Sequence, residues 1–442
     1  MSQHQASAQP EKRLFISLIT RDISLADAVL DLIDNSINSA IIAQRKKLQS
    51  PKDYIKLLEL KPGNDISEIN VRLSEKEFFI ADTCGGIPMK LAEDQVFRFG
   101  RAQSSEEKSS GDTLSVYGIG LKRAVFKMGD HVQITSAHPD GGFFMDMHVH
   151  KWERLEQNQW SIPIEDYSKP RNEPYGTRIQ ISKLYPDISN RIADGKFKGE
   201  LASRIARTYN YFLERVVRVK INGEKVEPID IAFGANTASE IFSSGGVAAA
   251  VMAGISVPKG KFHVADTAGW YVFCNGRAVA FADKTAITGW GTFLPSFQPK
   301  HRPFLGLVFF TSENPELLPW TTTKSSINQE SAVWQHALRV MGTVGKQITG
   351  FLDKRYSDDG TEISKDELLE AAGKAVSAFE AVSTQKRQFK PAQAKRELTS
   401  VQFAVKKSEI DKVKVYLGRR TMSNTEVGRH TFDYFLENIV GK

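Results

Sequence analysis

Apolar residues recur at helical spacing over residues 25–40, LADAVLDLIDNSINSA, and predict an amphipathic helix. Ser24 stands directly before this helix, in the position of an N-cap. Asp31, Asn35 and Asn38 follow one another at intervals of four and three residues, so they share one helix face. Such a polar column is either an ordinary solvated face or a binding site, and the helix alone leaves both interpretations open.

Strand-like and helical patterns alternate over the rest of the first half. The stretches INVRLSEKEFFIAD, HVQITSAH, GGFFMDMHVH and GTRIQISKL alternate apolar with polar residues and predict strands. KLAEDQVFRFG and ELASRIARTYNYFLERVV predict helices, and RVKINGEKVEP predicts a hairpin that turns at Asn222-Gly223. This mixture predicts an α/β fold, a two-layer sandwich with a mixed sheet and helices on one face.

Composition changes divide the chain into parts. Gly, Ala and Ser accumulate over residues 233–260 and indicate a domain boundary there. Beyond it, YVFCNGRAVAF and FLGLVFF predict strands, while SAVWQHALRVMGTVGKQITGFLDKRY and KDELLEAAGKAVSAFEAV predict helices. The predicted parts are a first domain (1–228), a smaller α/β domain (229–345), a helical and basic linker (346–399) and a strand–helix–helix module (400–442).

Composition excludes several classes of protein. Among the 442 residues no apolar run approaches the length of a membrane span, and the first residues lack the apolar stretch of a secretory signal. The only cysteines, Cys84 and Cys274, exclude a disulfide framework and fit a reducing cytoplasm. No Cys/His cluster has the sequence spacing of a zinc site, so a zinc site is not expected.

The positive charge is concentrated at the C-terminal end. Residues 384–442 carry 13 Lys and Arg against 6 Asp and Glu, which equals the net charge of +7 of the whole chain. The remainder is therefore neutral, and an anionic partner is expected for the tail rather than for the whole surface.

Three short motifs suggest a nucleotide site. ADTCGGIP places Asp82 at a strand end before paired glycines, a turn on which a flat ring could lie while the carboxylate accepts from an exocyclic amine. YGIGLKRAVFKMG places Gly118 and Gly120 before a helix whose first turn carries Lys122, an arrangement that favours phosphate. YGTRIQIS places Gly176-Thr177 at the head of a strand. Each motif alone is equally an ordinary turn or helix start.

The order of these motifs resembles the gyrase B, heat-shock chaperone, histidine kinase and MutL superfamily of ATPases over about residues 14–228. TRDISLADAVLDLIDNSI is similar to bacterial stand-alone ATP-binding members. The resemblance implies ATP and Mg²⁺ as cofactors and a lid over residues 98–116. It assigns the remaining motif residues to ATP: Asp82 reads adenine, Gly86 lies beneath the base, Thr177 supports the adenine site, and Gly118, Gly120 and Lys122 hold the phosphates.

The helical motif would supply the catalytic groups. Asn35 matches the asparagine that holds Mg²⁺, and Asp31 matches the carboxylate that polarises the attacking water. Hydrolytic relatives mostly carry Glu at the position of Asp31, and the shorter side chain suggests slow turnover. Asp34 is a less favourable substitute base because it lies about 100° from Asn35 around the helix. Asn38 and Cys84 also depart from the usual residues, although Gly85-Gly86 retain the turn.

The second domain adds a candidate catalytic lysine. YVFCNGRAVAF resembles the VNGR hairpin of the MutL transducer domain, and LPWTTTKSSIN resembles the gyrase loop whose lysine reaches the γ-phosphate. Lys324 matches that lysine, which would stabilise transition-state charge. A solvated loop lysine is the alternative.

The tail SVQFAVKKSEIDKVKVYLGRRTMSNTEVGRHTFDYFLENIVGK predicts a strand with Val401, Phe403 and Val405 on one face, then a helix from about residue 408 that ends at Gly418. A second helix should begin at the capping box of Ser423 and Glu426. The pattern resembles ribbon–helix–helix DNA-binding modules, which implies roles for five side chains: Gln402, Ala404 and Lys406 toward bases, and Arg419 or Arg420 toward phosphates. A helical dimerisation or docking module is the alternative.

These observations together predict a cytoplasmic Mg²⁺-dependent ATPase, with Asp31 and Lys324 as catalytic residues. By resemblance, ATP would close a homodimer and hydrolysis would reopen it. The alternatives are an ATP-gated scaffold with negligible turnover, which binds a partner protein, and a DNA-associated ATPase that uses residues 384–442.

Overall fold

The computed structural model describes residues 11–47, 66–99, 114, 118–156, 159–213, 215–257, 263, 265–354, 365–382, 385–390 and 404–441. These residues form two compact units. The larger unit contains the described residues up to 390, and the smaller contains those from 404 onward.

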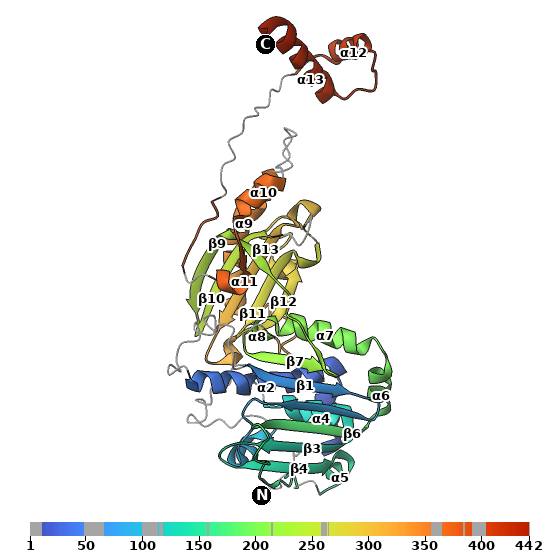
Figure 1. Cartoon of the computed structure of the whole chain (residues 1–442), viewed down its shortest axis with the longest axis vertical. Coiled ribbons are helices and arrows are strands. Elements are labelled where there is room, and N and C mark those ends of the chain that lie inside the picture. The colour runs from blue at the N-terminus through green and yellow to red at the C-terminus, as the bar shows by residue number, and fades with distance from the viewer. Residues whose placement is uncertain are drawn as a thin grey trace, which may run out of the picture. The chain divides into compact units, whose positions relative to one another are not determined.

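An eight-stranded sheet forms the first part of the larger unit, in the order β5-β4-β3-β6-β2-β1-β7-β8 (Figure 1). β1 pairs with β7 in parallel and the other neighbours are antiparallel, so the sheet is mixed as predicted. Its strands are β1 (Ser67–Leu73), β2 (Glu77–Asp82), β3 (Gly129–Ala137), β4 (Gly142–His148), β5 (Glu165–Tyr167), β6 (Gly176–Leu184), β7 (Val217–Ile221) and β8 (Glu224–Lys225).

Helices from four parts of the sequence accompany this sheet, and alternate strand residues such as Val71 and Ile134 are buried in the shared core. The helices are α1 (Lys12–Thr20), α2 (Leu25–Lys47), α3 (Met89–Leu91) with a π-helical turn (Ala92–Val96), α4 (Gly120–Met128), α5 (Val149–Glu153), α6 (Pro186–Ala193), α7 (Phe197–Thr208) and α8 (Asn210–Leu213). α2 packs against α4 and contacts β1 and α7. The α/β fold class is confirmed.

A six-stranded mixed sheet follows in the order β12-β11-β13-β10-β9-β14. β13 is buried at every position because it lies between β11 and β10, which explains its uninterrupted apolar sequence. Its strands are β9 (Ala232–Ser244), β10 (Val247–Ser256), β11 (Gly269–Cys274), β12 (Arg277–Asp283), β13 (Phe304–Thr311) and β14 (Ala375–Ser377). The long helix α9 (Ala332–Asp353) packs on β9, β10 and β13.

The stretch KDELLEAAGKAVSAFEAV is not continuously helical, contrary to the sequence prediction. α10 (Lys365–Ala372) ends before Gly373, whose φ of +74° does not continue a right-handed helix. The next residues form β14, which pairs with β9, and then the short helix α11 (Ala378–Ala381). Residues 365–382, which the sequence assigns to a linker, thus contribute a strand to the second sheet.

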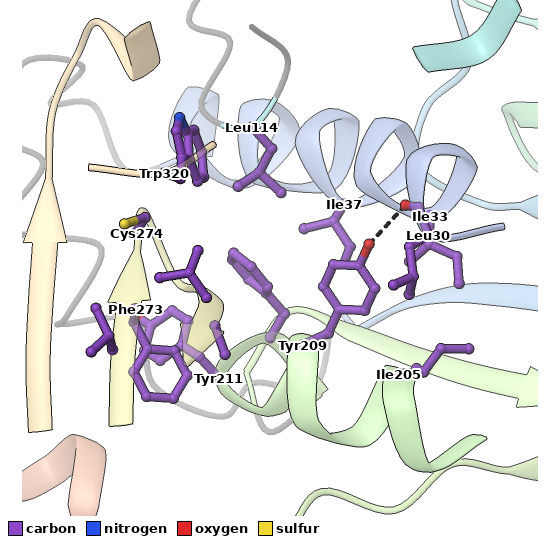
Figure 2. Packing of buried hydrophobic residues seen from close by; sticks show 14 of the residues in the cluster. Leu30, Ile33, Ile37, Leu114, Ile205, Tyr209, Tyr211, Phe273, Cys274 and Trp320 are labelled. Atoms are coloured by element: carbon purple, nitrogen blue, oxygen red, sulfur yellow. Dashed lines mark hydrogen bonds between the residues drawn. The ribbon is translucent and has the colours of Figure 1, made fainter. Parts of the chain in front are cut away.

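One hydrophobic core runs from α2 through α8 into the second sheet. Leu30, Ile33 and Ile37 of α2 lie beside Tyr209, and Phe273 of β11 lies beyond Tyr211 (Figure 2). The Tyr209 hydroxyl oxygen lies 2.7 Å from the Leu30 carbonyl oxygen. This continuity connects α2 to the second sheet through Tyr209 and α8.

The smaller unit contains α12 (Lys407–Tyr416) and α13 (Asn424–Phe435), followed by a π-helical turn (Leu436–Val440). The Ser423–Glu426 capping box is present, as predicted, with the Glu426 amide donating to Ser423 Oγ over 3.2 Å. Of the predicted strand, residues 401–403 lie outside the described residues, and residues 404–406 form no strand. Several large apolar side chains in the smaller unit are exposed: Val415, Tyr416, Phe432, Tyr434, Phe435, Ile439 and Val440. No described helix of the chain is long and apolar enough to cross a membrane.

Candidate functional site

The polar column of α2 is enclosed by protein. Ser24 caps the helix by accepting from the Asp27 amide over 3.1 Å, as predicted. Asp31 is 5% exposed and Asn38 is 7% exposed, whereas Asn35 is half-buried. The solvated-face interpretation is therefore wrong, since two of the three polar side chains are withdrawn from water.

Asp31 lies between Arg123 and the start of α4. Nε and Nη2 of Arg123 both donate to Asp31 Oδ2, over 2.9 and 2.5 Å. A Cβ at Gly120 would lie 3.5 Å from Cβ and Cγ of Asp31, so the backbone of α4 approaches this carboxylate closely. Burial raises the pKa of Asp31, and the Arg123 charge opposes that effect.

The other two members of the column differ in their surroundings. Asn38 Oδ1 accepts from the Leu114 amide over 3.4 Å, and Leu114 itself is fully buried. Leu114 belongs to the predicted lid, of which residues 100–113 and 115–116 lie outside the described residues. Within the described chain, the Asn35 side chain has no hydrogen-bond partner, so its amide oxygen remains available to a ligand.

Asp82 organises the turn after β2. Its Oδ2 accepts from Ser36 of α2 over 2.6 Å, and its Oδ1 accepts from the Cys84 amide over 3.0 Å. Burial raises the pKa of Asp82, while the hydrogen bonds oppose this. Gly86 has a φ of +74°, and a Cβ there would lie 1.9 Å from the Ala137 carbonyl oxygen, so only glycine fits.

The Gly-Thr pair at the head of β6 meets this same turn. The Thr177 amide donates to Asp82 Oδ1 over 3.2 Å, and Thr177 Oγ1 lies 3.0 Å from Ser136 Oγ. Ser136 in turn accepts from the Ile87 amide over 2.7 Å. The structure thus brings together Asp82, Gly86 and Thr177, which are far apart in the sequence.

The glycine-flanked start of α4 lies beside α2, but Lys122 of its first turn contacts backbone carbonyl oxygens of another segment. Gly118 has a φ of +62°, and α4 begins at Gly120. Lys122 is buried, and its Nζ donates to the carbonyl oxygens of Val96 and Arg98 over 2.8 and 2.5 Å. Burial lowers the pKa of Lys122 to about 8. A phosphate contact by Lys122 stays a prediction.

Lys324 forms an ion pair with Asp34 rather than with Asp31. Lys324 Nζ lies 3.0 Å from Asp34 Oδ2, and Arg277 Nε lies 3.0 Å from Asp34 Oδ1. Tyr209 donates to the same Oδ1 over 2.7 Å, and Arg277 also donates to the Lys324 carbonyl oxygen. Burial alone would raise the pKa of Asp34, but the two cations outweigh it and hold that pKa below its usual range. Because Lys324 is 8% exposed, it is not a solvated loop lysine.

Sequence reasoning missed three members of this arrangement: Arg123, Tyr209 and Arg277. Arg277 follows the turn Asn275-Gly276 in the stretch YVFCNGRAVAF. An arginine at the start of a buried strand was the sequence signal that could have identified it. Arg123 and Tyr209 carry no sequence signal of their partners, because the contacts join elements distant in the chain.

These residues form a site with two kinds of chemistry. The Asp82 carboxylate and the glycine-rich backbone at one end suit hydrogen-bond recognition of a flat polar ring. The half-buried amide of Asn35, one helical turn from the Asp31 carboxylate, suits a hydrated cation. The fold and site together define an α/β nucleotide-binding domain. A family model described as "Histidine kinase-, DNA gyrase B-, and HSP90-like ATPase" matches residues 23–177.

The superfamily predicted from the sequence is confirmed for this part of the chain. No curated protein matches the chain.

Proposed function

We propose that this chain is a Mg²⁺-dependent ATPase in which α2 supplies both the water-activating carboxylate and the metal ligand. One observation carries the proposal: Asp31 lies against Gly120 at the start of α4, one helical turn from the unpartnered amide of Asn35. The chemistry of Asn35 fits Mg²⁺, which prefers oxygen ligands and keeps part of its water shell. When bound, Mg²⁺ would neutralise charge on the phosphates.

Asp31 is suited to accept a proton from water. Both bonds from Arg123 go to Oδ2, and none of the described residues gives Oδ1 a hydrogen bond. Arg123 therefore orients the carboxylate and favours its ionised form, while Oδ1 faces the backbone of Gly120. We assign Asp82, Gly86 and Thr177 to adenine, and Gly118 and Gly120 to the phosphates. Lys122 would reach the phosphates by leaving the two carbonyl oxygens that it contacts in the structure.

The second domain would respond to the nucleotide through Lys324. In the structure its ammonium group is paired with Asp34, one residue before Asn35. A γ-phosphate at Asn35 would compete with Asp34 for this cation. Movement of Lys324 to the phosphate would leave Asp34 paired with Arg277 alone. This exchange would couple the position of the second sheet to bound ATP. It would form part of a cycle in which ATP closes the lid and a homodimer.

Steady-state hydrolysis with Mg²⁺ tests the proposal, comparing the wild type with Asp31→Asn after ATP affinity has been matched. We expect ATP binding to persist and kcat to fall by about 10²-fold or more, the usual contribution of a positioned base. Asp194→Asn, an exposed aspartate in a surface ion pair, is the matched control. If both proteins bind ATP and neither hydrolyses it, the ATP-gated scaffold replaces this proposal.

DNA association is a second candidate function, favoured by the smaller unit. Its sequence is basic and its two helices expose many apolar side chains, which suits a module completed by pairing with a second copy. In a ribbon–helix–helix arrangement, Arg419 or Arg420 would contact phosphates. A protein partner for the same apolar faces is the alternative.

A further inference from the structure

Two histidines face each other on neighbouring strands of the first sheet. His131 of β3 is directly opposite His148 of β4, and their rings stack with centroids 4.4 Å apart. Val132 and Ile134 of β3 are buried in the core, so His131 lies on the opposite side of the strand. Asp146, two residues before His148, lies on this same side.

These three side chains bring metal-ligand atoms together. One donor atom of each residue lies within 4.8 Å of the other two, and His131 Nε2 is 2.9 Å from Asp146 Oδ1. The side chains are 23%, 42% and 24% exposed for His131, Asp146 and His148, so an ion could enter from solvent. Small side-chain rotations would bring the donors to bonding distance.

The second nitrogen of each ring is already held. His131 Nδ1 lies 3.1 Å from Ser182 Oγ, and His148 Nδ1 lies 3.0 Å from Asp130 Oδ2. Metal-binding histidines are usually fixed in this way, by a carboxylate or another polar group on the ring nitrogen that does not bind the metal. With Nδ1 engaged, Nε2 is the nitrogen that each ring can offer.

The carboxylate is prepared in a similar way. Gln133 Nε2 donates to Asp146 Oδ2 over 2.7 Å, which leaves Oδ1 toward the histidines. Two imidazoles and one carboxylate form a ligand set for zinc and related ions, and such three-ligand sites keep a position for water.

We propose that His131, His148 and Asp146 bind a divalent transition-metal ion of the zinc type, with Asp130 and Ser182 as positioning residues. The site differs in chemistry from Asn35, which offers only an oxygen ligand. It joins β3 to β4 immediately after α4, since β3 begins at Gly129 where α4 ends at Met128. The bound ion would therefore stabilise the structure next to the C-terminal end of α4, the proposed phosphate-binding helix. Sequence spacing did not predict this site because its ligands converge only across paired strands.

Metal binding is measured on the untagged full chain after a chelator has removed any bound metal. The chain then competes with a chromogenic chelator for Zn²⁺ in a large excess of Mg²⁺. Co²⁺ provides a second readout through its visible absorption. We expect one equivalent of Zn²⁺, about 100-fold or greater weakening in His131→Gln and His148→Gln, and about 10- to 100-fold weakening in Asp130→Asn. His150→Gln, an exposed neighbouring histidine on α5, should bind as the wild type does.

Circular dichroism and melting curves establish that each variant is folded, which these partly exposed positions should permit. No stoichiometric binding by the wild type overturns the proposal. So does undiminished binding by a folded His131→Gln/His148→Gln double variant, or an equal loss in His150→Gln. The experiment does not use ATP, and its result is therefore independent of the proposed ATPase activity.

Discussion

Asp31 shows how one side chain balances opposing effects. Its burial disfavours the ionised form, and Arg123 opposes that effect through two hydrogen bonds to a single oxygen. A carboxylate with a raised pKa is a stronger base, but it acts only above that pKa. The residue that tunes Asp31 should therefore control the pH at which hydrolysis begins.

Arg123→Gln should shift the acid limb of the kcat profile to higher pH. Removing the guanidinium leaves burial unopposed, so the pKa of Asp31 rises and less of it is ionised at neutral pH. Turnover should fall near neutrality and recover as pH increases. A pH–rate profile checks this, with Arg191→Gln, an exposed ion-pair arginine, as control. An acid limb that does not move would exclude Arg123 as the tuning residue.

Contacts between residues of one short motif could be predicted from the sequence. Ser24 at the start of α2 and the Ser423–Glu426 box at α13 depend on contacts three residues apart, and both are present. Arg123 could not be found in the same way. Its partner Asp31 is 92 residues away, and only the packing of α4 on α2 brings them together.

At the scale of elements, Asp34 connects α2 to the second sheet. Arg277 begins β12 and Lys324 lies in the loop after β13, yet both cations reach this single buried carboxylate. Removing one partner from a buried ion cluster is costly because the remaining charges stay buried without compensation. The cluster should thus contribute to holding the two sheets together.

Asp34→Asn should destabilise the chain by about 3–5 kcal/mol at neutral pH. Because the folded pKa of Asp34 is lowered, its contribution is present above the unfolded pKa of about 3.9 and is lost as pH falls through the folded value. Denaturant unfolding at neutral and acidic pH measures this: the variant should lose less stability on acidification than the wild type does. Asp194→Asn should cost under about 1 kcal/mol. An equal cost for both variants would contradict the argument.

Helices and strands were predicted correctly where the periodicity of apolar residues and the local composition agreed. The apolar run of β13 and the long pattern of α9 were both found, because each buries a continuous apolar surface. β9 and β10 were interpreted as a boundary, since Ala, Gly and Ser have low strand propensity. β10 forms a strand because it lies between β13 and β9 with most of its residues buried, and β9 forms one because it pairs with β10 and β14. No local pattern contains these pairings.

At the scale of the whole molecule, the proposed functions belong to different parts of the chain. The candidate ATP site and the Asp34 cluster lie in the larger unit, while the exposed apolar side chains of α12 and α13 lie in the smaller one. Residues 385–390 belong with the larger unit: the Arg387 amide bonds the Ser239 carbonyl, and the Phe389 amide donates to Gln347. A truncation that separates the functions should therefore end after Ala392.

A chain ending at Ala392 should lose DNA binding and keep nucleotide-dependent dimerisation. The removed segment carries 10 Lys and Arg against 6 Asp and Glu, so the affinity of the full chain for duplex DNA should fall steeply as salt rises. Sedimentation with a non-hydrolysable ATP analogue measures the dimer, and salt-dependent binding measures the DNA contact. ATP affinity should be unchanged and serves as the folding control. If the truncated chain binds DNA as the full chain does, the tail is not the DNA-binding part. If neither form dimerises with the analogue, the clamp cycle is wrong even if hydrolysis occurs.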